Sequence, residues 1–292
     1  MNSCPLCGEA RTSIYIDGED RKIAAVNVGS SRAMLPFGQI LHCDACSFAF
    51  RRYRPDDESL ELLYREAGDD VYESEASGRA RTAKRRARIV SSFCPSPGRL
   101  LDVGCASGAF LSAMAAAGWI VEGVEPGDRH FKMASRVLGG RVQNCTLQHA
   151  QFSSRFDVVT LWDVLEHVRD PVGFLRTCGH LTRPSGRLFI NVPDIESLQA
   201  RLLGRRWPLL LAEHLNYFTL HTLVLCARQA GLKFEARGRM PAAFSLEYLM
   251  YRLSQHSIPG ASLARRWMAA SPVGRLTVPV WMGECLAVLR RD

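Results

Sequence analysis

Between residues 99 and 192, short apolar runs alternate with longer amphipathic segments. The runs at 99–103, 120–125, 140–144, 156–161 and 186–192 predict strands, and the segments at 109–117, 129–138 and 171–181 predict helices. Strands that are apolar throughout and alternate with helices form a parallel sheet covered on both faces. The predicted fold class is therefore α/β, a Rossmann-like, mostly parallel sheet with helices on both faces.

The sequence after this region is less regular but still predicts further elements. We expect a helix over 221–230, a strand over 233–237, helical structure over 244–270 with a break at Pro259 and Gly260, and a strand over 284–289. No apolar run is long enough for a transmembrane helix, and the first residues lack the apolar core of a signal peptide. A cytoplasmic location is the resulting expectation.

Two C-x-x-C pairs stand near the start of the chain, at Cys4 and Cys7 and at Cys43 and Cys46. Each pair aims two thiolates at one point, and two such pairs complete the tetrahedral S4 site that zinc favours. Four protein ligands leave no open position, so the metal would be structural. Residues 1–50 are therefore expected to form a small zinc ribbon, with short strands over 22–28 and 39–42. A redox pair or metal-free cysteines are the alternatives.

The net charge of +8 is unevenly distributed. Basic and acidic residues are equal in number over 1–197, so the whole excess lies in 198–292. A phosphorylated substrate, a nucleic acid or an anionic membrane surface would be attracted to such a region, although scattered solvated arginines would give the same excess. A second basic run, over 79–88, predicts either a solvated helix face or an anion-binding one.

The turn after the first predicted strand points to a particular ligand. Gly104 and Gly108 flank it, but the spacing is a poor match to the dinucleotide pattern G-x-G-x-x-G. Asp102 would repel a diphosphate and attract a cation, and Glu125 at the end of the second strand can bind both hydroxyls of a ribose. S-adenosylmethionine combines a ribose with an ammonium and a sulfonium, and it carries no phosphate.

Three segments in this order resemble the motifs of class I S-adenosylmethionine-dependent methyltransferases. They are LDVGCASGAFL (101–111), VEGVEPG (121–127) and FDVVTLWDVLEHVRDP (156–171). Ala106 departs from the family, which commonly has a glycine there. The cysteine pairs, RPDDESLELLY and the later W…EHLNYFT segment also resemble a bacterial subgroup that joins a zinc ribbon to this fold and methylates sugars and secondary metabolites.

The resemblance implies a domain order and a role for individual residues. A helical connector would cover 51–96, and the methyltransferase domain would cover 97–292 with a substrate-lid insertion around 195–220. The resemblance places Gly104, Cys105 and Gly108 along the methionine part of the cofactor, with Asp102 orienting the turn or the ammonium. It implies further contacts to the ribose, the adenosine, the adenine edge and the methionine from Glu125, Pro126, Cys145, Thr146, Trp162 and Asp163.

An oxygen or carbon nucleophile needs a base that removes its proton. The candidates are His167 in DVLEHV, and His214 with Tyr217 in EHLNYFT. The expected function is methyl transfer to a small molecule, such as a sugar, a nucleotide-linked sugar or a secondary metabolite, which could be phosphorylated or lipid-linked. An RNA methyltransferase that uses the ribbon and the basic helix is an alternative, although the basic residues lack interleaved aromatics. A non-catalytic module that binds S-adenosylmethionine is another.

Overall fold

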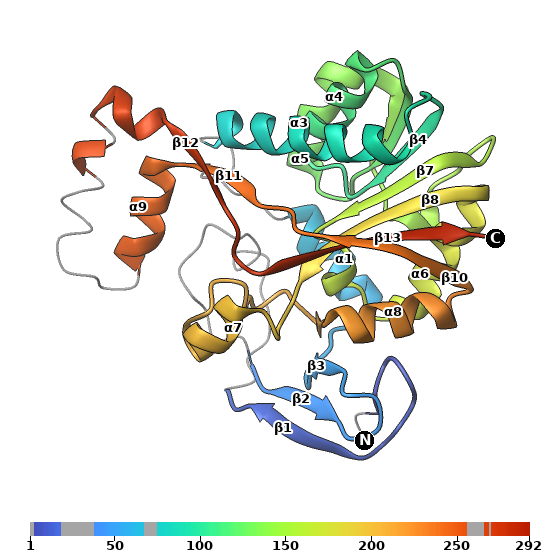
Figure 1. Cartoon of the computed structure of the whole chain (residues 1–292), viewed down its shortest axis with the longest axis vertical. Coiled ribbons are helices and arrows are strands. Elements are labelled where there is room, and N and C mark those ends of the chain that lie inside the picture. The colour runs from blue at the N-terminus through green and yellow to red at the C-terminus, as the bar shows by residue number, and fades with distance from the viewer. Residues whose placement is uncertain (1–2, 19–37, 67–74, 256–265, 269) are drawn as a thin grey trace.

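The computed structural model describes residues 3–18, 38–66, 75–255, 266–268 and 270–292. Its centre is a seven-stranded sheet with the order β10-β13-β8-β7-β4-β5-β6 (Figure 1). Strands β4 to β8 are parallel, and β13 runs antiparallel between β8 and β10. The bounds are β4 Arg99–Val103, β5 Ile120–Val124, β6 Val142–Gln143, β7 Phe156–Trp162, β8 Thr182–Pro193, β10 Leu232–Gly238 and β13 Glu284–Arg291.

Helices cover both faces of this sheet. The helices α3 (Ala76–Phe93), α4 (Ala109–Ala116) and α5 (Asp128–Leu138) lie on one face, and α6 (Pro171–Leu181) and α8 (Leu220–Gln229) lie on the other (Figure 1). Successive strand residues point to opposite faces, so Leu100 and Leu101, both fully buried, belong to two different hydrophobic clusters. The predicted α/β class, with a mostly parallel sheet between two helical layers, is confirmed.

Local sequence signals explain where these helices begin. Asp170 caps α6 by accepting a hydrogen bond of 2.9 Å from the backbone of Gly173, and Pro171 occupies the first helical position, where its missing N–H costs nothing. Helix α8 begins with a capping box between Thr219 and Thr222.

The N-terminal region forms a second sheet with the order β1-β2-β3-β9. Its strands are β1 (Thr12–Ile16), β2 (Ile40–Cys43), β3 (Ala49–Arg51) and β9 (Asn216–Tyr217), and the last of these comes from the EHLNYFT segment. The rings of Phe48 and Phe218 lie 5.1 Å apart, and both belong to the hydrophobic cluster beneath the main sheet. The N-terminal region therefore shares a sheet and a core with the rest of the molecule. The strand predicted over 22–28 lies outside the described residues.

The segment after the main sheet differs from its prediction. A two-stranded sheet of β11 (Ala242–Ser245) and β12 (Thr277–Val280) packs against α3, so Phe244 and Ser245 are in a strand and α9 (Leu246–Gln255) begins after them. The buried carboxylate of Glu75 accepts hydrogen bonds from the backbone and the hydroxyl of Ser245, which fixes this strand. The predicted break at 259–260 lies outside the described residues.

The remaining elements are short. They are helix α1 (Asp57–Glu66), helix α7 (Leu198–Leu203) and the 3-10 turns Gly139–Arg141, Leu147–His149, Leu165–His167, Gly204–Arg206 and Pro272–Arg275. Strand β6 is only two residues long, because the 3-10 turn at Gly139–Arg141 takes up the start of the run predicted as a strand. Within the described part of the chain, no helix combines the length and apolarity needed to cross a bilayer.

Candidate functional site

A cavity of about 430 Å³ opens at the carboxyl ends of β4, β5 and β7. Ligands in open α/β sheets bind at this edge. The cavity has three further walls, which are one face of α3, strand β11, and the segment that contains Leu209, Leu211, Glu213 and His214. Residues far apart in the sequence therefore enclose one cavity, and each wall carries different functional groups.

The turn between β4 and α4 forms the first wall. Gly104 and Gly108 have φ angles of +73° and +75°, and a Cβ atom on Gly104 would lie 2.8 Å from Val164. Ala106 also has a positive φ, of +46°, which is where the family pattern has glycine. Asp102 is buried and accepts a hydrogen bond of 2.6 Å from the Thr160 hydroxyl. Burial raises its pKa to about 7.

Glu125 closes this end of the cavity. Its carboxylate accepts hydrogen bonds from the backbone N–H of Ala106, at 2.8 Å, and of Gly127, at 2.9 Å. Burial raises its pKa to about 7, although both hydrogen bonds favour the ionised form. Each carboxylate oxygen can accept a further hydrogen bond, so Glu125 can support the turn and still bind hydroxyls of a ligand. Its predicted contact with a ribose is compatible with this position.

Trp162 and Asp163 follow strand β7 and also line the cavity. Asp163 has a φ of +61° and accepts hydrogen bonds of 2.6 Å from both Asn191 and Arg86. The Arg86 guanidinium lies 4.8 Å from the centre of the Trp162 ring, a cation–π distance. The indole N–H of Trp162 is buried and has no hydrogen-bond partner among the described residues. An acceptor atom on a bound ligand would satisfy it.

Two Glu-His pairs from different parts of the chain meet on the opposite side of the cavity. Glu166 and His167 follow β7, and Glu213 and His214 precede β9. The backbone N–H of Leu215 donates to the carbonyl of Glu166 at 2.8 Å, which ties the two segments together. The imidazole rings of His167 and His214 are 4.8 Å apart and nearly perpendicular.

Backbone carbonyls fix the tautomer of both histidines. Nδ1 of His214 donates to the carbonyl of Leu209 at 2.9 Å, and Nδ1 of His167 donates to that of Glu213 at 3.2 Å while also lying 2.8 Å from the Tyr64 hydroxyl. The proton on each ring is thus on Nδ1, which leaves Nε2 as a free base. Burial lowers the pKa of His167 to about 4 and that of His214 well below its usual value. Both rings are therefore neutral at physiological pH.

The carboxyl group of Glu166 lies beside these rings and is deeply buried. The residue is 1% exposed, and neither carboxylate oxygen has a hydrogen-bond partner in the part of the chain that the structure describes. Burial raises its pKa well above the ordinary value. The candidate ligand atoms of Glu166, His167 and His214 all lie within 4.8 Å of one another, close enough to hold a divalent cation or the polar groups of a substrate. A ligand that carries a hydrogen-bond donor or a cation would give the Glu166 carboxyl a partner.

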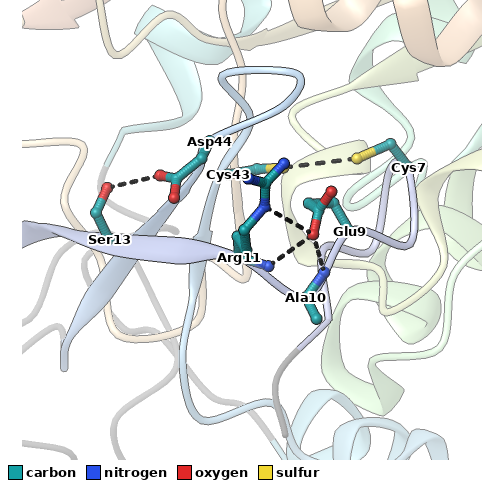
Figure 2. A network of polar contacts seen from close by, with 7 residues as sticks. All are labelled: Cys7, Glu9, Ala10, Arg11, Ser13, Cys43 and Asp44. Atoms are coloured by element: carbon teal, nitrogen blue, oxygen red, sulfur yellow. Dashed lines mark hydrogen bonds and ion pairs between the residues drawn. The ribbon is translucent and has the colours of Figure 1, made fainter.

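The four N-terminal cysteines converge as predicted from their spacing. Their Sγ atoms lie within 4.8 Å of one another, with Cys4–Cys46 at 3.6 Å and Cys7–Cys43 at 3.5 Å. Sulfurs around a tetrahedral zinc with bonds of about 2.3 Å are separated by about 3.8 Å, so the cluster has suitable dimensions, and these distances are far too long for disulfides. Figure 2 shows Cys7 and Cys43 facing each other beside the turn that Glu9 stabilises by accepting from the backbone of Ala10 and Arg11.

Several predicted residues lie away from the cavity wall. Tyr217 is fully buried on the ribbon side, packs near Trp207 and donates to the carbonyl of Leu211 at 3.3 Å. Tyr217 is not among the residues that line the cavity, and its catalytic role stays a prediction. Pro126, Cys145 and Thr146 also lie outside the wall, in the loops after β5 and β6.

The family assignment rests on a match to a known protein family. Residues 72–236, more than half of the chain, match the model of a methyltransferase domain. The chain belongs to this methyltransferase family. It is an S-adenosylmethionine-dependent methyltransferase, as the turn and the acidic residue after β5 predicted, and the family implies this cofactor. The chemistry of the site fits it, with Glu125 available for a ribose and an unpartnered indole N–H available for an acceptor.

Sequence relatives include ubiquinone biosynthesis O-methyltransferases. One from Aromatoleum aromaticum is 30% identical over 46% of this methyltransferase and 64% of the relative, and one from Thiobacillus denitrificans is 30% identical over 51% and 71%. The chain thus spans about two thirds of the length of these relatives.

Solved structures resemble the methyltransferase in fold alone. A 1,6-didemethyltoxoflavin-N1-methyltransferase from Burkholderia thailandensis has a TM-score of 0.50 at 18% identity, covering 86% of this chain and 98% of that one. A magnesium protoporphyrin IX methyltransferase from Synechocystis PCC 6803 has a TM-score of 0.50 at 15% identity, covering 77% and 89%.

Sequence reasoning missed part of the site. Arg79, Thr82 and Arg86 project from one face of α3 into the cavity wall, whereas their basic neighbours Lys84 and Arg85 are exposed. The spacing of three, four and seven residues was an available signal for this face. Tyr64 and Glu284 gave no comparable signal, because only the tertiary structure brings them to the cavity.

Proposed function

We propose that this methyltransferase transfers the methyl group of S-adenosylmethionine to a hydroxyl oxygen of a small molecule, with His214 as the general base. The convergence of two neutral imidazoles and a buried carboxyl on the cavity supports this proposal. S-adenosylmethionine supplies a methyl group on a sulfonium, which leaves as a neutral thioether. The named O-methyltransferase relatives support a hydroxyl acceptor. The cavity volume of about 430 Å³ is within the range of small-molecule sites.

The protein residues have separate tasks in the proposed reaction. Glu125 and the turn at Gly104–Gly108 would hold the cofactor, and Glu166 would orient the acceptor by a hydrogen bond. As the new C–O bond forms and the C–S bond breaks, the hydroxyl proton would pass to Nε2 of His214. His167 can contact the acceptor through its own Nε2, because its Nδ1 is fixed by Tyr64 and Glu213. In-line displacement depends mainly on this positioning and on the exclusion of water.

The charge of the cavity disfavours an anionic acceptor. Its wall carries the carboxyl groups of Glu75, Asp163, Glu166, Glu213 and Glu284 against the guanidinium groups of Arg79 and Arg86. A polyphosphate chain is bound by an excess of basic groups, so this wall is a poor surface for RNA. It equally disfavours a phosphorylated small molecule.

The test is a methyl-transfer assay with labelled S-adenosylmethionine and a panel of catechols, phenols, free sugars, nucleotide-linked sugars and RNA. We expect label on a neutral hydroxylated small molecule, and loss of that label in His214→Ala. Label on RNA alone would overturn the proposal, and so would label on a small molecule that His214→Ala transfers at the wild-type rate.

We also propose that the four cysteines bind a structural zinc ion. Elemental analysis of the purified protein should find one zinc per chain, and Cys43→Ser should lose it and unfold at a lower temperature. Cys226→Ser is the control, because Cys226 is a buried cysteine without a partner thiol. Full zinc content in Cys43→Ser would contradict this assignment.

A further inference from the structure

Helix α7 and the 3-10 turn after it expose an unusual set of apolar side chains. Leu202 is 75% exposed, Leu198 63% and Leu203 46%, whereas Ala200 on the inner side is 7% exposed. Leu198 and Leu202 are four residues apart, so they share one face of the helix. Leu202 is the most exposed large hydrophobic residue in the described part of the chain.

Arginines surround these leucines. Arg201, Arg205 and Arg206 are all exposed and lie in the same short stretch. The acidic neighbour Glu196 lies 3.8 Å from Arg201 in a solvent-exposed ion pair, which is a weak interaction. The α7 patch, defined as Leu198, Arg201, Leu202, Leu203, Arg205 and Arg206, is therefore apolar at its tip and positive around it.

A hollow of about 440 Å³ adjoins this patch. Arg201 and Arg205 line it on one side, and Tyr15 of strand β1, which is 45% exposed, lines it on another. Figure 1 shows α7 at the edge of the molecule, away from the helices α3 to α5 that cover the main sheet. A broad partner could reach the patch without touching that side of the molecule.

We propose that the α7 patch docks on an anionic lipid bilayer. Exposed leucines flanked by arginines suit the boundary between acyl chains and headgroups, where the leucines enter the apolar layer and the guanidinium groups pair with lipid phosphates. An acidic protein would pair with the arginines but would not account for leucines that project between them. The same segment continues into the cavity wall at Leu209 and Leu211, so docking would bring the cavity close to the bilayer. This inference goes beyond the proposed function and does not depend on it.

The test is flotation of the full chain with two kinds of vesicle. One is phosphatidylcholine alone, and the other is phosphatidylcholine with an equal amount of phosphatidylglycerol. We expect the protein to float with the anionic vesicles and to be released as salt is raised, since screening weakens the attraction. Protein that stays in solution with anionic vesicles at low salt would overturn the proposal.

Variants distinguish vesicle binding through the α7 patch from nonspecific adsorption of the protein. Leu198→Ser with Leu202→Ser should weaken vesicle binding about tenfold or more, because two leucines no longer enter the apolar layer. Arg205→Gln with Arg206→Gln should weaken it about tenfold and reduce its salt dependence. Val137→Ser is the matched control, since Val137 is 67% exposed on α5 beside Arg136.

Binding of S-adenosylmethionine, measured by calorimetry, reports on folding of each variant. It should be unchanged in the leucine and arginine variants, because none of these residues lines the cavity. A leucine variant that binds the cofactor normally and floats like the wild type would contradict the proposal. A Val137→Ser protein that loses flotation would contradict it as well.

Discussion

The two ends of the cavity differ in the hydrogen bonds that their buried carboxyl groups accept. At the end that we propose for the cofactor, Asp102 accepts from Thr160, and Glu125 accepts from two backbone N–H groups. At the end that we propose for the acceptor, Glu166 is also buried and has no hydrogen-bond partner among the described residues, and two neutral imidazoles lie beside it. A buried polar group without a partner is costly, so the acceptor end gains more from a ligand than the cofactor end does.

This difference suggests a division of labour. The carboxylates at the cofactor end hold a turn in a fixed shape before any ligand arrives, so removing one should affect binding. At the acceptor end, Nδ1 of each imidazole is held by the protein while Nε2 is left for a ligand, so removing one of these rings should affect the chemical step. The following predictions test this separation, beginning with the largest expected effect.

Replacing His214 with alanine should lower kcat by about 10²–10⁴-fold, which is the usual contribution of a general base. Affinity for S-adenosylmethionine should stay within about twofold, because the ring is not at the cofactor end. Steady-state kinetics and calorimetry give the two values. Tyr217→Phe is the matched control in the same segment and should retain activity, since its hydroxyl bonds only to the Leu211 carbonyl. A larger loss of kcat in Tyr217→Phe than in His214→Ala would contradict the assignment of His214 as the general base.

Replacing Glu125 with alanine should weaken cofactor binding by roughly 100-fold, because hydrogen bonds to a charged group each contribute about 1.5–3 kcal/mol. Calorimetric titration of the variant measures this loss. Glu122→Ala is the control, since Glu122 lies on strand β5, three residues before Glu125, but pairs with Arg99 away from the cavity. Equal losses in the two variants would mean that strand β5, and not the carboxylate, determines binding.

Cofactor affinity should rise by about tenfold between pH 6 and pH 8. Burial raises the pKa of Asp102 and of Glu125 to about 7 in the free protein. A bound ammonium and sulfonium favour the ionised carboxylates, so binding must release protons below pH 7 and strengthens as pH rises through 7. Titrations in buffers of different ionisation enthalpy would detect the released protons. Proton uptake on binding would contradict this sign.

Tyr64→Phe should have the smallest effect, a reduction in kcat of less than about tenfold. The variant removes the Tyr64 hydroxyl, which lies 2.8 Å from Nδ1 of His167, but leaves the hydrogen bond that this nitrogen donates to the Glu213 carbonyl. The pH profile of kcat distinguishes loss of ring orientation from loss of packing. A reduction as large as that of His214→Ala would make His167, and not His214, the principal base.

The cofactor end was predictable from sequence because it is built locally. Strand, turn and helix follow one another within about 20 residues, so Asp102, Gly104, Gly108 and Glu125 predict the turn without knowledge of distant contacts, and the family implies the ligand that they predict. The same locality made the parallel strands and the cysteine pairs predictable. Ala106 shows that a departure from the motif in residue type need not change the backbone, since this alanine adopts the left-handed conformation that the motif usually assigns to glycine.

The acceptor end was only partly predictable because it forms by long-range contacts. His167 and His214 were recognised separately, but the sequence does not show that Glu166 joins them or that Tyr64 fixes one of them. Strand β9 pairs with β3 of the ribbon region, and this pairing draws Tyr217 into a core on the ribbon side, away from the cavity. Residues 244 and 245, predicted as the start of a helix, instead end strand β11, because Ser245 donates hydrogen bonds to the distant Glu75 carboxylate.

The most direct test of the central claim is a calorimetric titration of S-adenosylmethionine into the wild type, Glu125→Ala and His214→Ala. The division of labour predicts that Glu125→Ala loses most of its affinity while His214→Ala binds like the wild type. Equal loss in both variants, or loss in His214→Ala alone, would contradict it. This measurement needs no knowledge of the acceptor, so its result stands whatever the acceptor is.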